Sequence, residues 1–189
     1  MQNHSRPLHQ ACVLTSALLF SMLGCLTTVA ADKPPTLMKS ELGATRNVHS
    51  FGKTLLCGQP TAAEFAEARK RGIKTVITLR EKTEIDWNEA AALRKLNMRF
   101  YQLGFRAPDS LTPEIIEKTV SIMGDPKSTP VMLHCASANR VGALWLAHRV
   151  LNDKIDIEKA REEAKAVGLR TPEYEQRVLE YIKQKNSKQ

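Results

Sequence analysis

Short apolar runs and longer amphipathic stretches alternate along most of the chain. The short runs, rich in β-branched and aliphatic residues, predict β-strands, and stretches with one apolar face predict α-helices. Thr61 and Glu64 have the spacing of a capping box, and Thr112-Pro113 is a second helix start. Strands that alternate with helices of this length favour an α/β fold, a mostly parallel central sheet of about four strands with helices on both faces. The expected strands are 54–57, 73–79, 99–103 and 131–134, and the expected helices begin near 61, 86, 112, 140, 157 and 172.

The N-terminal residues differ from the rest in their pattern. Residues 1–10 are polar with one arginine and no acidic residue, residues 11–31 are almost wholly apolar or small, and small residues precede Asp32. This order is typical of a secretory signal peptide. Two alternatives stay open: residues 11–31 are about long enough to span a bilayer as an uncleaved anchor, and the residues around Cys25 loosely resemble a lipoprotein processing site.

These patterns predict three segments. Residues 1–31 form the signal peptide or anchor, residues 32–44, with Pro34-Pro35, form an extended leader, and residues 45–189 form one domain. We therefore expect an exported protein, periplasmic or secreted, that contacts a membrane only through its N-terminal segment. A membrane-anchored protein or a lipoprotein is the alternative.

Charge and cysteine content add two constraints. The 28 basic residues against 20 acidic ones give a formal net charge of +8, which suits anionic partners such as phosphorylated molecules. The sequence has no basic stretch interleaved with aromatic residues, so we do not expect it to bind nucleic acid. Of the four cysteines, two lie in the N-terminal segment, which leaves Cys57 and Cys135. This pair could form a reversible disulfide in an oxidising compartment, or Cys57 could be a small apolar residue at a strand end.

The run from Pro130 to Gly142 carries the clearest chemistry. An apolar strand leads into Cys135, a loop of small residues follows, and Arg140 opens the next helix. The backbone N–H groups of such a loop and the N-terminus of the helix attract an anion and favour the reactive thiolate. Arg140 supplies a planar fork for two phosphate oxygens. The alternative is a buried structural cysteine.

His134-Cys135 followed by Arg140 resembles the signature of the cysteine-dependent protein phosphatases, of the dual-specificity and tyrosine type. Residues 57–61 and 72–80, with the Cys135 loop and residues 141–145, resemble the small bacterial branch that also occurs fused to β-lactamase-like hydrolases. The resemblance covers about residues 45–183. It implies hydrolysis of phosphomonoesters of proteins or small molecules, through a phosphocysteine intermediate and without a cofactor.

The resemblance also implies roles for individual residues. Cys135 is the nucleophile, Arg140 clamps the phosphate, and Asp109 is the expected general acid. His134 supports the thiolate, and Gln59, Arg80 and Arg106 are weaker candidates for the pocket. No histidine spacing predicts a metal site. The loop residues expected to bind the substrate are Ala136, Ser137, Ala138 and Asn139.

Three departures from the phosphatase pattern leave other functions open. Four residues rather than five separate Cys135 from Arg140, Ala138 stands where glycine is usual, and Val141 stands where a hydroxyl usually assists departure of the thiolate. A loop of this length also resembles that of the rhodanese sulfurtransferases, in which the cysteine carries a persulfide. A module that binds phosphate or sulfate without turnover is a third possibility.

Overall fold

The computed structural model describes residues 1–2 and 34–187, and the fold is that of the unit that begins at Pro34. The predicted signal peptide or anchor, residues 1–31, lies outside the described residues except for its first two. No helix in the described residues combines the length and the hydropathy needed to cross a membrane.

A six-stranded sheet forms the centre of the domain, in the order β1-β2-β3-β6-β4-β5. The four strands β3, β6, β4 and β5 run parallel to one another, and they are the four strands predicted from the sequence. The expected number of strands was wrong, because β1 and β2 extend the sheet as an antiparallel edge and make it mixed. The strands are β1 (Met38–Lys39), β2 (His49–Phe51), β3 (Thr54–Cys57), β4 (Thr75–Thr78), β5 (Arg99–Gln102) and β6 (Val131–His134).

In the described residues, six α-helices and two short 3₁₀ helices connect or follow the strands. The capping box at Thr61 is confirmed, since its hydroxyl accepts the Glu64 N–H and the Glu64 carboxylate accepts the Thr61 N–H. Thr112 likewise caps the helix that starts with Pro113. The helices are α1 (Ala62–Lys70), η1 (Lys82–Glu84), α2 (Glu89–Lys95), η2 (Pro108–Ser110), α3 (Pro113–Gly124), α4 (Asn139–Leu151), α5 (Ile157–Val167) and α6 (Pro172–Asn186).

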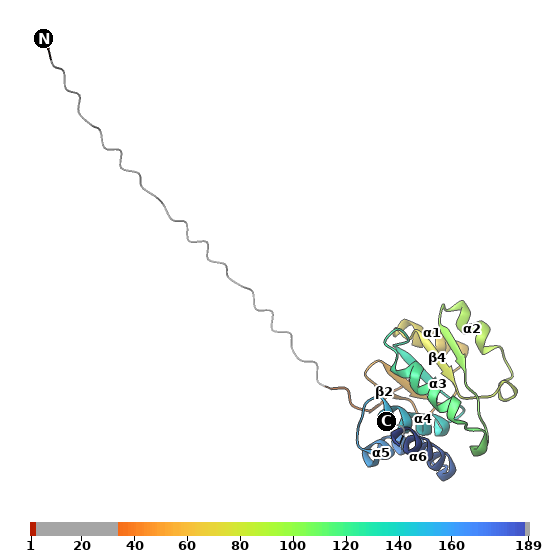
Figure 1. Ribbon diagram of the computed structural model, residues 1–189. Helices are drawn as coiled ribbons and strands as arrows, with labels where there is room; N and C mark the ends of the chain where they lie inside the picture. Colours follow the sequence, from red (N-terminus) through yellow and green to blue (C-terminus); the bar gives the residue numbers. More distant parts are fainter. Residues whose placement is uncertain (3–33, 188–189) are drawn as a thin grey trace. The chain divides into compact units, whose positions relative to one another are not determined.

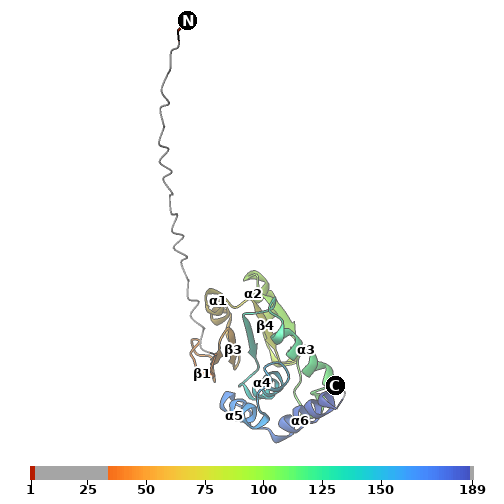
Figure 2. The same cartoon turned by 60° about the vertical axis from the view of Figure 1, so that its left-hand side comes forward.

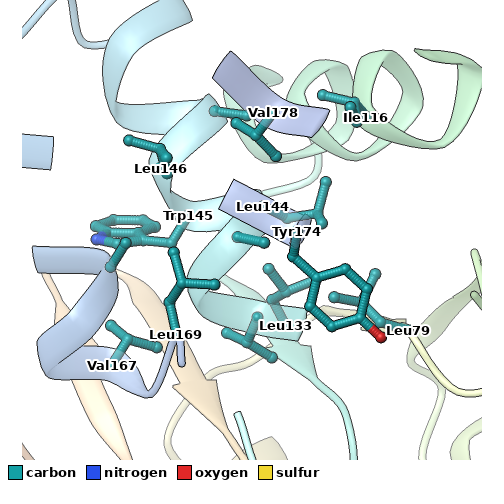
Figure 3. Close-up of a cluster of buried hydrophobic side chains, with 14 of the residues drawn as sticks. Leu79, Ile116, Leu133, Leu144, Trp145, Leu146, Val167, Leu169, Tyr174 and Val178 are labelled. Atoms are coloured by element: carbon teal, nitrogen blue, oxygen red, sulfur yellow. The ribbon is translucent and has the colours of Figure 1, made fainter. Parts of the chain in front are cut away.

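Helices cover both faces of the sheet, as the sequence predicted (Figures 1 and 2). The smaller core lies on one face, where α1 and α2 contribute Phe65, Ala68 and Leu93. The larger core lies on the other face, against α3, α4, α5 and α6. Figure 3 shows part of this larger core, with Tyr174 projecting into it from α6. Helix α4 is buried along most of its length, which fixes the loop that precedes it.

The segment expected as an extended leader contributes to the domain. Within residues 32–44, Met38 and Lys39 form β1, and Leu42 is fully buried in the smaller core. The parallel strands β3, β4, β5 and β6 all end at one edge of the sheet, where ligands bind in open α/β sheets. Cys135 follows the last residue of β6 and therefore lies at this edge.

Candidate active site

The Cys135 loop has free backbone donors. The N–H groups of Ala136 and Ser137 make no hydrogen bond to any acceptor within residues 34–187. Those of Asn139, Arg140 and Val141 belong to the first turn of α4, where a helix leaves its N–H groups unpaired. Cys135 is a free thiol and only 1% exposed. The loop therefore combines a buried nucleophile with backbone groups that can bind an anion.

Neighbouring segments hold the loop in place. The Gln59 N–H donates to the Ala136 carbonyl over 3.4 Å, and the Asn47 amide donates to the Ser137 carbonyl over 2.9 Å. Arg170, in the connection between α5 and α6, donates through Nη2 to the Ser137 hydroxyl over 2.8 Å. Arg170 is exposed, so its guanidinium adds positive charge beside the loop.

The side chain of Asn139 contacts the connection between α5 and α6. Its Oδ1 accepts the N–H groups of Arg170 and Thr171, over 2.8 and 3.3 Å. Its Nδ2 donates to the Thr171 hydroxyl over 2.7 Å. The side-chain amide of Asn139 therefore joins two parts of the protein.

Ala138 adopts the left-handed conformation that glycine favours. Its φ and ψ are 66° and 2°, and it directly precedes α4. This conformation costs an alanine about 1 kcal/mol. Gly168 packs against it, since a Cβ on Gly168 would lie 3.3 Å from the Cβ of Ala138. The departure from glycine is thus accommodated as local strain in a buried loop.

Arg140 is held by four hydrogen bonds on one side of its guanidinium. Nη1 donates to the carbonyls of Leu79 and Phe105 and to Glu84 Oε1, over 2.8, 2.6 and 2.7 Å. Nη2 donates to Glu84 Oε2 over 2.7 Å. In the described residues, Nε and the second hydrogen of Nη2 have no acceptor, so the opposite edge of the fork is left for a ligand.

The pair of Glu84 and Arg140 is largely buried and fixes both charges. Burial opposes the charged form of Arg140, but the hydrogen bonds and charge of Glu84 outweigh it and raise the pKa of Arg140. Burial also disfavours the Glu84 carboxylate, yet Arg140, the Glu81 N–H and Arg80 together lower its pKa. The carboxylate and the guanidinium therefore stay ionised at neutral pH.

His134 is the last residue of β6, directly before the Cys135 loop, and is fully buried. Its Nε2 is 2.8 Å from Glu89 Oε1, without aligned hydrogen-bond geometry, and its ring meets the edge of Phe65. Gln59 donates to the same Glu89 oxygen over 3.3 Å and accepts from Arg80 over 2.7 Å. Gln59 and Arg80 therefore link Glu89, which lies beside His134, to the Glu84–Arg140 pair, since Arg80 also donates to the Glu84 carbonyl.

Asp109 is exposed in η2 and is not brought into contact with Cys135 in the described residues. A cavity of about 500 Å³ borders Asp109 and Pro108 together with four residues of α6. The segment that carries Asp109 begins beside Arg140, because the Phe105 carbonyl accepts from Arg140. Arg106 is exposed, and its carbonyl accepts from the Tyr174 hydroxyl over 2.5 Å.

Cys57 and Cys135 lie on opposite faces of the sheet. Cys57 is the neighbour of His134 across β3 and β6, and it packs in the smaller core. Cys135 follows His134 and packs in the larger core. Burial raises the pKa of the Cys57 thiol, which keeps it protonated. Both cysteines are free, and no group of three potential metal ligands gathers in the described part of the chain.

Sequence reasoning did not find three residues of this site: Glu84, Glu89 and Tyr174. The spacing of Arg80 and Glu84 after a strand was an available signal for an ion pair, since the two side chains are four residues apart. Glu89 and Tyr174 carry no such signal, because each reaches the site from a helix distant in sequence. Val141, noted in place of a hydroxyl, is fully buried in the larger core.

This site, on this sheet, is that of the cysteine-dependent phosphatases of the dual-specificity and tyrosine type. A family model described as "DSP-PTPase phosphatase fused to NAD+ Kinase" matches residues 38–181, and the chain belongs to this family. The resemblance to phosphatases is thereby confirmed. That the matching branch is the one also found fused to β-lactamase-like hydrolases stays a prediction.

The three solved structures described next share the fold and less than a quarter of their sequence with this chain. P. aeruginosa TpbA in complex with pTyr is 17% identical with a TM-score of 0.61, and the match covers 80% of this chain and 91% of that chain. The core catalytic domain of the PP-IP phosphatase SIW14 from S. cerevisiae is 20% identical with a TM-score of 0.61, over 76% and 92% of the two chains. A DUF442 protein from Shewanella putrefaciens CN-32 is 17% identical with a TM-score of 0.63, over 76% and 95%. No curated protein sequence matches this one.

Proposed function

We propose that this protein hydrolyses phosphomonoesters in two steps, through a phosphocysteine at Cys135. The observation that carries the proposal is the pairing of free loop N–H groups with the open edge of Arg140, both beside one buried thiol. Together they provide donors for the oxygens of a phosphoryl group that Cys135 attacks. Arg170 adds a further positive charge next to Ser137.

In the first step the Cys135 thiolate attacks phosphorus, and the bond from phosphorus to the ester oxygen breaks. Asp109 gives its proton to the leaving oxygen, which departs as an alcohol or phenol. In the second step water attacks phosphorus and the phosphorus–sulfur bond breaks. The Asp109 carboxylate takes a proton from that water, which restores the thiolate and the acid and releases inorganic phosphate.

Asp109 is assigned as the acid because its segment starts at the residue whose carbonyl binds Arg140. Only the short stretch from Arg106 to Pro108 separates the acid from this anchor. No hydroxyl follows Arg140, since Val141 is an aliphatic core residue. We therefore expect the second step, breakdown of the phosphocysteine, to limit the turnover rate.

The test uses residues 32–189 and a simple aryl phosphate. We expect release of phosphate, no turnover by the Cys135→Ser variant, and a slower first step with Asp109→Asn. Activity equal to the Cys135→Ser background would refute the proposal. In the same experiment, turnover of thiosulfate and cyanide to thiocyanate would support a sulfurtransferase, and tight phosphate binding without either reaction would support a binding module.

We propose that the substrate is a phosphorylated protein or small molecule and that the protein is exported. Residues 11–31 are apolar or small and end before Asp32, which supports a cleaved signal peptide and a periplasmic or secreted enzyme. The N-terminal sequence of the protein purified from cells tests this assignment. A mature chain that begins at Asp32 supports it, and an intact N-terminus in the cytoplasmic fraction contradicts it.

A further inference from the structure

The first turn of α6 contacts both loops that the proposed reaction uses. On one side, Thr171, directly before α6, is held by Asn139 of the Cys135 loop through a hydrogen bond of 2.7 Å. On the other side, Tyr174 reaches the segment that carries Asp109. Its hydroxyl donates to the Arg106 carbonyl over 2.5 Å, and its ring packs edge-on against Phe105 with centroids 5.4 Å apart.

Other contacts of the acid segment are local or lie at its beginning. The Ser110 hydroxyl bonds to the backbone of Arg106 and Ala107, which shapes the turn but ties it to nothing else. Phe105 is anchored to Arg140 and Leu79. Within the described residues, Tyr174 makes the one side-chain hydrogen bond from another element to the stretch from Arg106 to Asp109.

We propose that Tyr174 is a positioning residue for the general acid, so that the first turn of α6 sets the spacing between the Cys135 loop and Asp109. This inference rests on the proposed function, in which Asp109 protonates the leaving group. Tyr174 is almost fully buried, and its ring is fixed in the larger core (Figure 3). The hydroxyl therefore presents a fixed donor to the Arg106 carbonyl.

The hydroxyl remains a donor at neutral pH. Burial raises the pKa of Tyr174, and the nearby Arg140 only partly opposes this effect. Removal of the hydroxyl keeps the ring packing against Phe105 but frees the Arg106 carbonyl from α6. Asp109, three residues further along, then samples positions from which proton transfer is less efficient, and a misplacement of about 1 Å can cost 100-fold in rate.

The test compares two aryl phosphates with the same phosphoryl group. Phenyl phosphate releases a phenol, whose pKa of about 10 makes protonation necessary, whereas 2,4-dinitrophenyl phosphate releases a stable anion that needs no proton. The full mature chain carries Asp109→Asn, Tyr174→Phe or both. We expect Asp109→Asn to lower kcat/KM for phenyl phosphate about 100-fold or more relative to the dinitrophenyl ester, and Tyr174→Phe to do so about tenfold.

The double variant separates positioning from structural support. If Tyr174 acts through Asp109, adding Tyr174→Phe to Asp109→Asn causes no further loss. Tyr181→Phe is the matched control, because it removes the same hydroxyl from an equally buried tyrosine two turns along α6, beside Lys185. Tyr181→Phe should leave kcat/KM unchanged for both substrates.

Two results would refute the positioning role of Tyr174 and leave the assignment of Asp109 as the acid intact. One is an equal loss for both substrates with Tyr174→Phe, and the other is a further loss in the double variant. A different result would refute the acid itself: if Asp109→Asn affects both esters equally, Asp109 does not protonate the leaving group, and the inference falls with that assignment.

Discussion

Replacement of Glu84 by glutamine tests how Arg140 is oriented. The substitution keeps the size of the side chain and one oxygen acceptor but removes the negative charge that faces the guanidinium. The side chains of Glu84 and Arg140 are 11% and 8% exposed, and both oxygens of Glu84 lie 2.7 Å from guanidinium nitrogens. This is a buried pair with two parallel hydrogen bonds, the geometry in which loss of a partner matters most.

The expected cost follows from burial. Removal of one partner from a buried ion pair costs about 3–5 kcal/mol, and the remaining carbonyls of Leu79 and Phe105 offset part of it, which leaves about 2–3 kcal/mol. For a domain of this size that corresponds to a decrease of about 5–10 °C in Tm. Because the guanidinium is then free to rotate, we also expect kcat/KM for an aryl phosphate to fall about 10- to 100-fold.

Chemical denaturation and steady-state kinetics measure the two effects. The control is Glu158→Gln, which removes one partner of the exposed contact with Arg161 and should change stability by less than about 0.5 kcal/mol. A Glu84→Gln protein with wild-type stability and kcat/KM would show that Glu84 does not orient Arg140.

Three further predictions follow from the same structure. Because the folded-state pKa of Glu84 is below its unfolded value, the stability difference between wild type and Glu84→Gln should be constant at neutral pH and shrink as pH falls below about 4.3; a difference that grows in acid would contradict the ionised pair. Asn139→Ala should lower stability by about 1–2 kcal/mol while the phosphate affinity of the Cys135→Ser protein changes less than about threefold; lost affinity with unchanged stability would make the Asn139 amide a phosphate ligand instead. Hydrogen peroxide should inactivate the wild type and the Cys57→Ser variant equally, by oxygen addition at Cys135; an intact-mass loss of two hydrogens that requires Cys57 would show a disulfide.

Local signals predicted most of the fold. The four parallel strands were visible as apolar runs, and the capping residues Thr61 and Thr112 marked helix starts that the structure has at the same residues. The strands β1 and β2 escaped prediction because they are two and three residues long. A run that short has no periodicity to read, and its pairing depends on a neighbour already in the sheet.

The residues of the site likewise divide into those with a local sequence signal and those placed by long-range packing. Cys135 and Arg140 are five positions apart and stand in one strand–loop–helix motif, so the sequence alone predicts that they meet. Glu84 contacts Arg140 across 56 positions, and Tyr174 contacts Arg106 across 68. Such contacts depend on the packing of helices on the sheet, which a single sequence does not specify. Asn139 was expected at the substrate because loop and helix-end contacts look alike in sequence.

The antiparallel edge of the sheet limits where the folded chain can begin. A protein that starts at residue 45 would lack β1 and the buried Leu42, and β2 would become an open edge with unpaired backbone groups. Open edges of this kind promote association between molecules. Cleavage after Ala31 would leave a short spacer ahead of β1. The predicted processing site therefore leaves the edge of the sheet intact.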